Sequence, residues 1–173
     1  MKRTLLFVFL LMSATQAIAG ADNVHFSGTL VAEPCTLPDA DKDVRLDFTA
    51  IETKFLYQYQ RTKSQPFFIH LEECDPTISK SVSITFQGAA DTELTDLIAI
   101  DASSTAKGVA IGIEREDGTL LPINKASQEM QLLSGETTLS FKAFVQVQPT
   151  VLANKSLNEG TFNAISTFIL GYQ

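Results

Sequence analysis

The residues with the most obvious chemical potential are the acidic side chains of one short segment. Asp39, Asp41 and Asp43 have the spacing that begins a calcium-binding loop, in which alternate carboxylates supply oxygen ligands. Such a loop also needs Gly at its sixth position and Glu at its twelfth, where this chain has Val44 and Ala50. We therefore interpret the segment as a solvated acidic turn and predict no bound metal.

The histidines and the other carboxylates suggest no catalytic arrangement. His25 and His70 fall on the polar side of alternating segments, so we expect both at the surface. Glu72, Glu73 and Asp75 are expected at a solvated strand end. The chain has no nucleophile elbow, no metalloprotease motif and no phosphate-binding glycine loop. We predict a protein that is not an enzyme and needs no cofactor.

Composition narrows the possible partners. The chain has 173 residues, which favours a single domain, and 45% of them are hydrophobic. Thirteen basic residues against twenty acidic ones give a net charge of −7 without any basic cluster, so nucleic acid is not an expected partner. The aromatic side chains of Phe55, Tyr57 and Tyr59 could stack on a sugar. We interpret them instead as anchors of a long connection over residues 51–65.

The N-terminal residues have the features of a secretory signal. Lys2 and Arg3 precede an apolar run over residues 5–12, and Ala17-Ile18-Ala19 supplies a small-x-small cleavage pattern. We predict a signal peptide over residues 1–19, with cleavage after Ala21 as the alternative. In an oxidising compartment, Cys35 and Cys74 would form a structural disulfide. Closing this loop of 39 residues is worth about 4 kcal/mol.

The exported part of the chain is dominated by segments in which apolar and polar residues alternate, which is typical of half-buried β-strands. Turn residues separate these segments, and Asp117-Gly118 predicts a tight hairpin. A short helix is expected over residues 149–155. The fold class is therefore all-β, an antiparallel sandwich, and the absence of Trp argues against an antibody-type domain. The expected strands cover residues 24–32, 67–72, 82–87, 97–100, 109–113, 120–123, 138–148 and 162–172.

The first and last of these strands do not suit a self-contained sandwich. Residues 24–32 alternate strongly but precede the disulfide, and residues 162–172 form an apolar final strand with no following strand to cover its second edge. A long apolar edge is an aggregation hazard that proteins normally protect.

These features together resemble the subunits of bacterial chaperone–usher pili. The resemblance rests on an alternating N-terminal extension with Gly28 at an inward position, followed by Cys35 and Cys74, and on a glycine and an aromatic residue near the C-terminus. Counting back from Gln173 as one, Gly160 is fourteenth and Tyr172 is second. The segments PFFIHLEEC, VSITFQG and EGTFNAISTFILGYQ are most similar to the minor adaptor subunits of P-type pilus tips.

The resemblance implies an immunoglobulin-like sandwich that lacks its last strand. It divides the chain into a signal peptide (1–19), a donor-strand extension (20–34) and a pilin domain (35–173). The implied partners are a periplasmic chaperone, an outer-membrane usher and neighbouring subunits, and the implied location is a fimbrium at the cell surface. The donor residues are Val24, Phe26, Gly28 and Leu30, and the acceptor-groove and chaperone-binding residues are Gly160, Phe162, Ala164, Phe168, Leu170, Tyr172 and Gln173.

Two alternatives remain at this point. The N-terminal segment could be an ordinary first strand of the same domain, because periodicity alone favours neither interpretation. The whole chain could instead be an exported single-domain binding module, such as a sugar-binding adhesin. Tip adhesins of the family carry an additional lectin domain and lack a donor extension, both of which favour the subunit interpretation.

Overall fold

The computed structural model describes residues 26–173, so the predicted signal peptide, His25 and the donor residue Val24 lie outside the described residues. The chain divides into two units, residues 1–31 and 32–173. The described part of the first unit, residues 26–31, forms no helix or strand. Its apolar side chains are exposed, Phe26 by 94% and Leu30 by 101%. The strand expected over residues 24–32 is therefore absent from residues 26–31.

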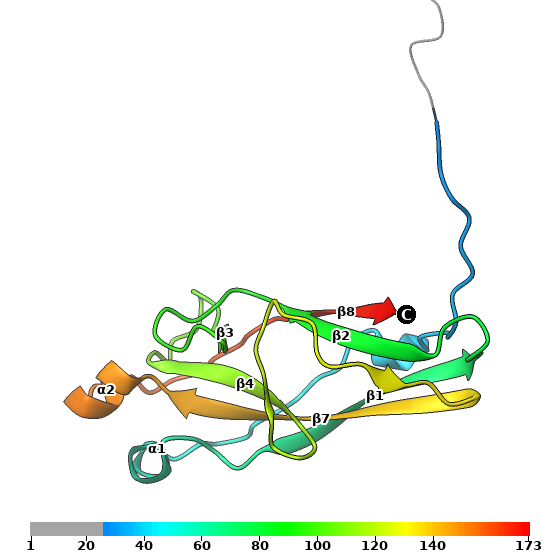
Figure 1. The fold of residues 1–173 in the computed structure, drawn as a ribbon. Helices are drawn as coiled ribbons and strands as arrows, with labels where there is room; N and C mark the ends of the chain where they lie inside the picture. Colours follow the sequence, from blue (N-terminus) through cyan, green and yellow to red (C-terminus); the bar gives the residue numbers. More distant parts are fainter. Residues whose placement is uncertain (1–25) are drawn as a thin grey trace, which may run out of the picture. The chain divides into compact units, whose positions relative to one another are not determined.

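The second unit contains two antiparallel sheets, which form separate layers in Figure 1. In the larger sheet the strand order is β1-β7-β4-β3, and β5 pairs with β4. The long strand β7 lies between β1 and β4, with Phe141 opposite Phe67 on one side and opposite Arg115 on the other. The bounds of these strands are β1 Gln65–Cys74, β3 Ile98–Ala99, β4 Val109–Arg115, β5 Leu120–Leu121 and β7 Gly135–Val147.

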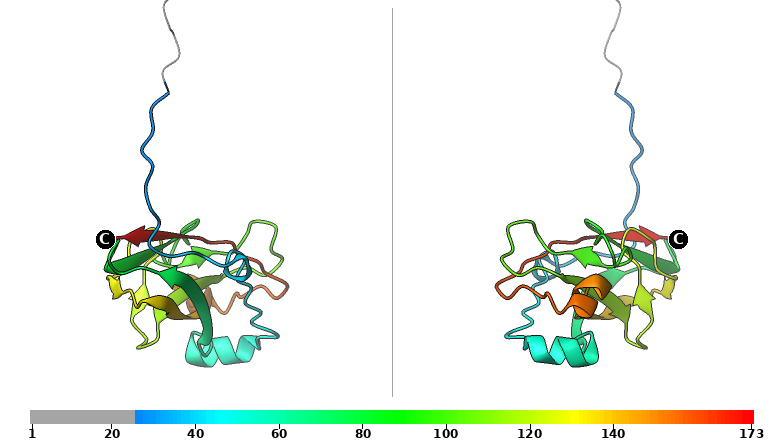
Figure 2. Two further views of the ribbon diagram at one scale, coloured as in Figure 1. Left: turned by 90° about the vertical axis from the view of Figure 1, so that its right-hand side faces the viewer. Right: turned by 90° about the vertical axis from the view of Figure 1, so that its left-hand side faces the viewer.

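The smaller sheet has the order β6-β2-β8, where β6 spans Met130–Gln131, β2 spans Ser81–Gln87 and β8 spans Thr167–Tyr172. Both views of Figure 2 show β8 in the layer opposite β7. The predicted Asp117-Gly118 hairpin is present between β4 and β5, and Gly118 has the positive φ of 88° that such a turn requires.

The core lies between the two sheets and follows the alternation in the sequence. In β2 the inward residues Val82, Ile84 and Phe86 are buried, whereas the residues between them are half-buried. β7 follows the same alternation up to Ala143, after which Phe144 on the other face is buried as well. Three aromatic rings form the centre: Phe141 lies 5.3 Å from Phe86 and 5.6 Å from Phe67, measured between ring centroids. In β2 and β7, period two therefore identified the strand and its inward face.

Two short helices lie outside the sheets. The predicted C-terminal helix is confirmed as α2, Pro149–Asn154, and the long connection expected over residues 51–65 contains a helix that was not expected. Residues Thr53–Tyr59 form the helix α1, which buries Leu56 and brings Phe55 within 4.6 Å of Tyr59, centroid to centroid. These neighbours at i and i+4 stabilise a helix that is too short for a clear period in the sequence. Among the helices of residues 26–173, none is long and apolar enough to cross a membrane.

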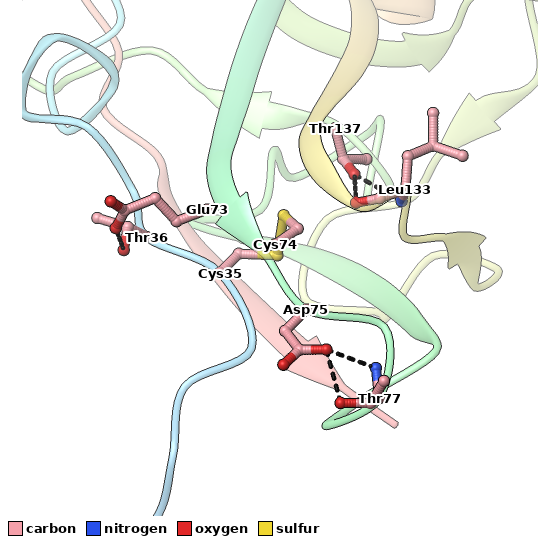
Figure 3. The surroundings of a disulfide bond; sticks show 8 residues. All are labelled: Cys35, Thr36, Glu73, Cys74, Asp75, Thr77, Leu133 and Thr137. Atoms are coloured by element: carbon pink, nitrogen blue, oxygen red, sulfur yellow. Dashed lines mark hydrogen bonds between the residues drawn. A yellow bond between two sulfur atoms is a disulfide. The ribbon is translucent and has the colours of Figure 1, made fainter.

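The predicted disulfide between Cys35 and Cys74 is present (Figure 3). It joins the start of the second unit to the end of β1, and both cysteines are buried. The expected solvated carboxylates lie beside it. Glu73 accepts a hydrogen bond from the Thr36 hydroxyl, and Asp75 closes a turn by accepting from the backbone N–H and hydroxyl of Thr77. These two hydrogen bonds lower the pKa of Asp75.

Candidate strand-acceptor groove

Strand β8 is an edge strand with an apolar inward face. It pairs only with β2, so its other edge has no neighbouring strand among the described residues. Phe168, Leu170 and Tyr172 point inward and pack against the core, whereas Ile169 is 46% exposed on the outer face. All three inward residues are only half-buried, which leaves room for further packing beside them.

The strand predicted to begin near Phe162 begins instead at Thr167. The preceding residues remain extended but bond differently: the carbonyl of Asn163 accepts from Asp101, and the carbonyl of Thr161 accepts from Thr105 and Ala106. These irregular contacts replace a ladder to β2. Side-chain alternation continues through the segment, with Phe162 and Ala164 half-buried between exposed neighbours.

Gly160 marks the beginning of this C-terminal segment. Its φ is +151°, and a Cβ atom on it would lie 2.3 Å from the Thr105 hydroxyl and 2.8 Å from the Ala106 nitrogen. A side chain at this position would therefore meet backbone as well as side-chain atoms. The close approach explains why glycine occupies the position.

Residues 42–48 face the C-terminal segment and were not singled out as a strand. Val44, Leu46 and Phe48 are half-buried and alternate with the exposed Arg45 and Asp47. The segment is extended, yet among the described residues it forms no strand and makes no backbone hydrogen bond over residues 43–48. The alternation of apolar and polar residues in this segment could have indicated an extended wall. The neighbouring aspartates favoured its interpretation as an acidic turn.

A cavity of about 980 Å³ lies between these two walls. One wall is residues 42–48 and the other is residues 162–168, so the groove reaches the predicted residues Phe162, Ala164 and Phe168. Leu170 and Tyr172 pack against the core beyond it. The floor is the sandwich core itself, formed by Phe67, Ile69, Phe86, Ile98, Ile111, Ile113 and Ala143.

Charges at the rim of the groove are paired with one another. Lys42 lies 2.6 Å from Asp39 and Arg45 lies 2.7 Å from Asp43. The hydrogen bond from Lys42 lowers the pKa of Asp39, and the bond to Asp43 raises the pKa of Arg45. Among the described residues, Asp101 is the one other charged residue that lines the cavity, so the recognition chemistry of the groove is mainly apolar packing plus backbone hydrogen bonding.

The geometry suits an extended polypeptide. A strand between residues 42–48 and 162–168 could form backbone ladders with both walls while its alternate side chains contacted the apolar floor. Nothing in the groove resembles a catalytic arrangement, and the residues described here contain no group of three His, Cys, Asp or Glu side chains placed to hold a metal.

The predicted solvated aspartate turn was partly wrong. Asp39 and Asp43 are exposed, but Asp41 is buried to 9% relative exposure because its carboxylate accepts a hydrogen bond from the backbone N–H of His70. His70 was expected at the surface and is 43% exposed by its side chain, yet its Nδ1 also lies 2.8 Å from the same carboxylate oxygen.

The fold and the groove define a class of protein: an immunoglobulin-like sandwich that is incomplete at one sheet edge. Comparison with known proteins gives the family. The model of the family described as "Fimbrial protein" matches residues 24–173, so the chain belongs to the fimbrial protein family. It is a structural, non-enzymatic subunit of fimbriae at the cell surface.

Individual relatives agree with this assignment. The chain is 32% identical to "Putative minor fimbrial subunit PmfF" of Proteus mirabilis over 93% of this chain and 88% of that protein. It is 31% identical to "Probable major fimbrial subunit LpfA" of Escherichia coli O157:H7 over 91% of this chain and 86% of that protein. The crystal structure of the P pilus rod subunit PapA has the same fold, with a TM-score of 0.71 and 24% identity over 82% of this chain and all of that one.

Proposed function

We propose that this fimbrial subunit polymerises by donor-strand complementation and exchange, receiving one strand in its groove and giving one strand to a neighbour. The observation that carries the proposal is the apolar cavity between two extended walls, residues 42–48 and 162–168. Residues 43–48 lack backbone partners within the described chain, and the free edge of β8 continues the opposite wall. A strand added there would complete the smaller sheet.

The N-terminal extension has the properties of the strand that is given. In this proposal residues 20–34 are the extension and residues 35–173 are the pilin domain. Val24, Phe26 and Leu30 insert into the groove of the preceding subunit, and Gly28 permits close approach there. The exposure of Phe26 and Leu30 supports this role, because burying each such side chain is worth about 1.5–3 kcal/mol.

The magnitudes indicate that the groove decides whether the subunit is stable. Three buried apolar donor residues contribute roughly 5–9 kcal/mol, and each ladder hydrogen bond adds about 0.5–1.5 kcal/mol. A whole domain is stable by only about 5–15 kcal/mol. We therefore expect the subunit to need a strand from a periplasmic chaperone before an outer-membrane usher brings the next subunit. The carboxylate of Gln173 is the proposed contact to basic residues of the chaperone.

The position within the fibre is a finer proposal: a minor adaptor subunit near the tip. Its support is the likeness of segments such as PFFIHLEEC to tip adaptors and the relationship to the minor subunit PmfF. The similar relationship to LpfA is the argument for the alternative of a major rod subunit. The two positions differ in whether the subunit's groove accepts the extension of a second identical subunit.

Periplasmic expression of the chain with and without a pilus chaperone tests the proposal, with size-exclusion chromatography of the released protein as the readout. Recovery only as a one-to-one chaperone complex is the expected result. Recovery as a stable monomer that does not bind the chaperone would contradict the proposal, because the sheet would then be complete without a donor strand. The rival interpretation, an exported sugar-binding module, would then be examined by ligand screening.

A further inference from the structure

The outer edge of β1 is a second place where a strand could add. β1 pairs only with β7, so its other edge has no strand beside it among the described residues. The same strand lies in the floor of the groove, to which it contributes Phe67 and Ile69. The domain thus has two sheet edges to which an incoming apolar strand could add, the edge of β8 and the edge of β1. Only the edge of β8 borders the groove.

Along the β1 edge the outward N–H groups are blocked by three different means. Glu72 donates to the carbonyl of Thr36 at 2.8 Å and accepts from its N–H at 2.7 Å, which fixes the outward direction at this position. Strand residues two apart point their N–H groups to the same side. His70, two residues earlier, accordingly donates outward, and its partner is the Asp41 carboxylate at 2.5 Å.

The block continues toward the start of the strand. Two positions before Phe68 is Pro66, which has no N–H to donate. Phe68 thus keeps the one outward N–H between the proline and the Asp41 cap. An incoming strand could still donate to the outward carbonyls of this stretch, but it would forfeit two of the ladder hydrogen bonds that it could otherwise accept. Proline, covering loops and inward-pointing charges are the means by which proteins protect sheet edges.

We propose that Asp41 and Pro66 close the β1 edge against strand addition and so confine donor strands to the groove beside β8. The proposal rests on the strand-exchange function proposed above. It also assigns Asp41 a positioning role, because Asp41 lies one residue before the groove wall of residues 42–48. The hydrogen bond from β1 to its carboxylate holds the start of that wall in place. The imidazole of His70 holds the same carboxylate oxygen through Nδ1, which fixes the cap in place.

The test uses the mature chain and a synthetic peptide of residues 20–32 in which Phe26 is replaced by the photo-crosslinker benzoylphenylalanine. Sites of attachment are mapped by mass spectrometry in wild type, in Pro66→Val and in the double variant Asp41→Ala/Pro66→Val. Asp41→Asn is the matched control, since its amide oxygen still accepts the His70 N–H. Pro66→Val leaves the Asp41 contacts intact and keeps the test informative if the double variant does not fold.

We expect wild type and Asp41→Asn to be labelled only along the groove walls. Labelling at residues 65–70 should rise about fivefold for each donor made available, which corresponds to about 1 kcal/mol per ladder hydrogen bond. An unchanged map in folded variants, or wild-type labelling at residues 65–70, would overturn the edge-closing role. Absence of groove labelling in wild type would instead contradict strand exchange itself, so the two failures are distinguishable.

Discussion

Phe48 and Phe162 lie across the groove from one another, with ring centroids 6.4 Å apart. Phe48 belongs to the wall of residues 42–48 and Phe162 to the C-terminal wall, and both pack against a cluster that contains Leu56, Val109 and Val145. This contact closes one end of the groove and ties both walls to the core beneath α1. A strand added between the two walls would therefore end at this contact.

Filling the groove should block strand addition without preventing the domain from forming its disulfide. Ala164 is a small inward residue between Phe162 and Phe168, so Ala164→Phe would place a ring where the donor backbone must run. We expect binding of the peptide of residues 20–32 to fall by at least about tenfold, measured by fluorescence anisotropy. Ala153→Phe on the exposed surface of α2 is the matched control, and equal binding by both variants would contradict the groove assignment.

Deleting residues 20–32 tests whether this segment donates a strand to another subunit without being needed for the domain's own groove to bind a strand. The described residues of this segment are exposed and form no strand, so the truncated chain should keep its fold and its capacity to bind a donor peptide. It should no longer join the groove of a preceding subunit in a two-protein exchange assay. Loss of the truncated domain's circular-dichroism signal would mean that the segment is an internal strand.

Gly160 provides a test of the close contact that begins the C-terminal wall. Gly160→Ala would place a methyl group against Thr105 and Ala106, and we expect a loss of about 2–4 kcal/mol in the free energy of unfolding. Gly118→Ala is the matched control, because Gly118 also has a positive φ but no atom within 4 Å of the added Cβ. Its cost should be about 1 kcal/mol. Urea denaturation of the peptide-bound variants measures both, and equal losses would contradict the steric explanation.

The sequence predicted the elements whose signal is local. Alternation located β1, β2 and β7 and their inward faces, because a strand with one buried face must repeat every two residues. Phe162, Ala164 and Phe168 followed from the same pattern. The pattern could not say that Thr161 and Asn163 would bond to residues 101–106 instead of forming a ladder to β2, since those partners lie far away in the chain.

Residues 42–48 show the corresponding limit for the site. Three alternating apolar residues are too few to distinguish a groove wall from a loop. In addition, this wall forms no backbone ladder in the described chain, so a prediction of strands could not have found it. Asp41 was misjudged for a related reason: its burial depends on the His70 N–H, a partner 29 residues away. Contacts of this kind are properties of the folded sandwich and leave no spacing in the sequence.

Removing the disulfide should weaken the domain without altering the groove. Replacing both Cys35 and Cys74 by serine releases a loop of 39 residues, whose closure is worth about 4 kcal/mol in the chain-entropy model. We expect the free energy of unfolding of the peptide-bound variant to fall by about 4 kcal/mol. The variant should therefore unfold at a lower urea concentration than the wild type. Peptide affinity in the folded fraction should remain unchanged, because neither cysteine lines the cavity. A matching loss of affinity would show that the disulfide also positions a wall.

Tyr172 should make stability fall at alkaline pH. Its pKa is raised, first by burial and second by the charge of Glu33, so the folded state binds the phenolic proton more tightly than the unfolded state. The resulting stabilisation is fully present below the ordinary tyrosine pKa of about 10 and is lost as pH rises through the raised value. Urea unfolding of the peptide-bound subunit at pH 8 and above should therefore show a steeper loss for wild type than for Tyr172→Phe. Tyr59→Phe, on the exposed face of α1, is the control that should follow wild type, and parallel profiles for all three proteins would contradict the assignment.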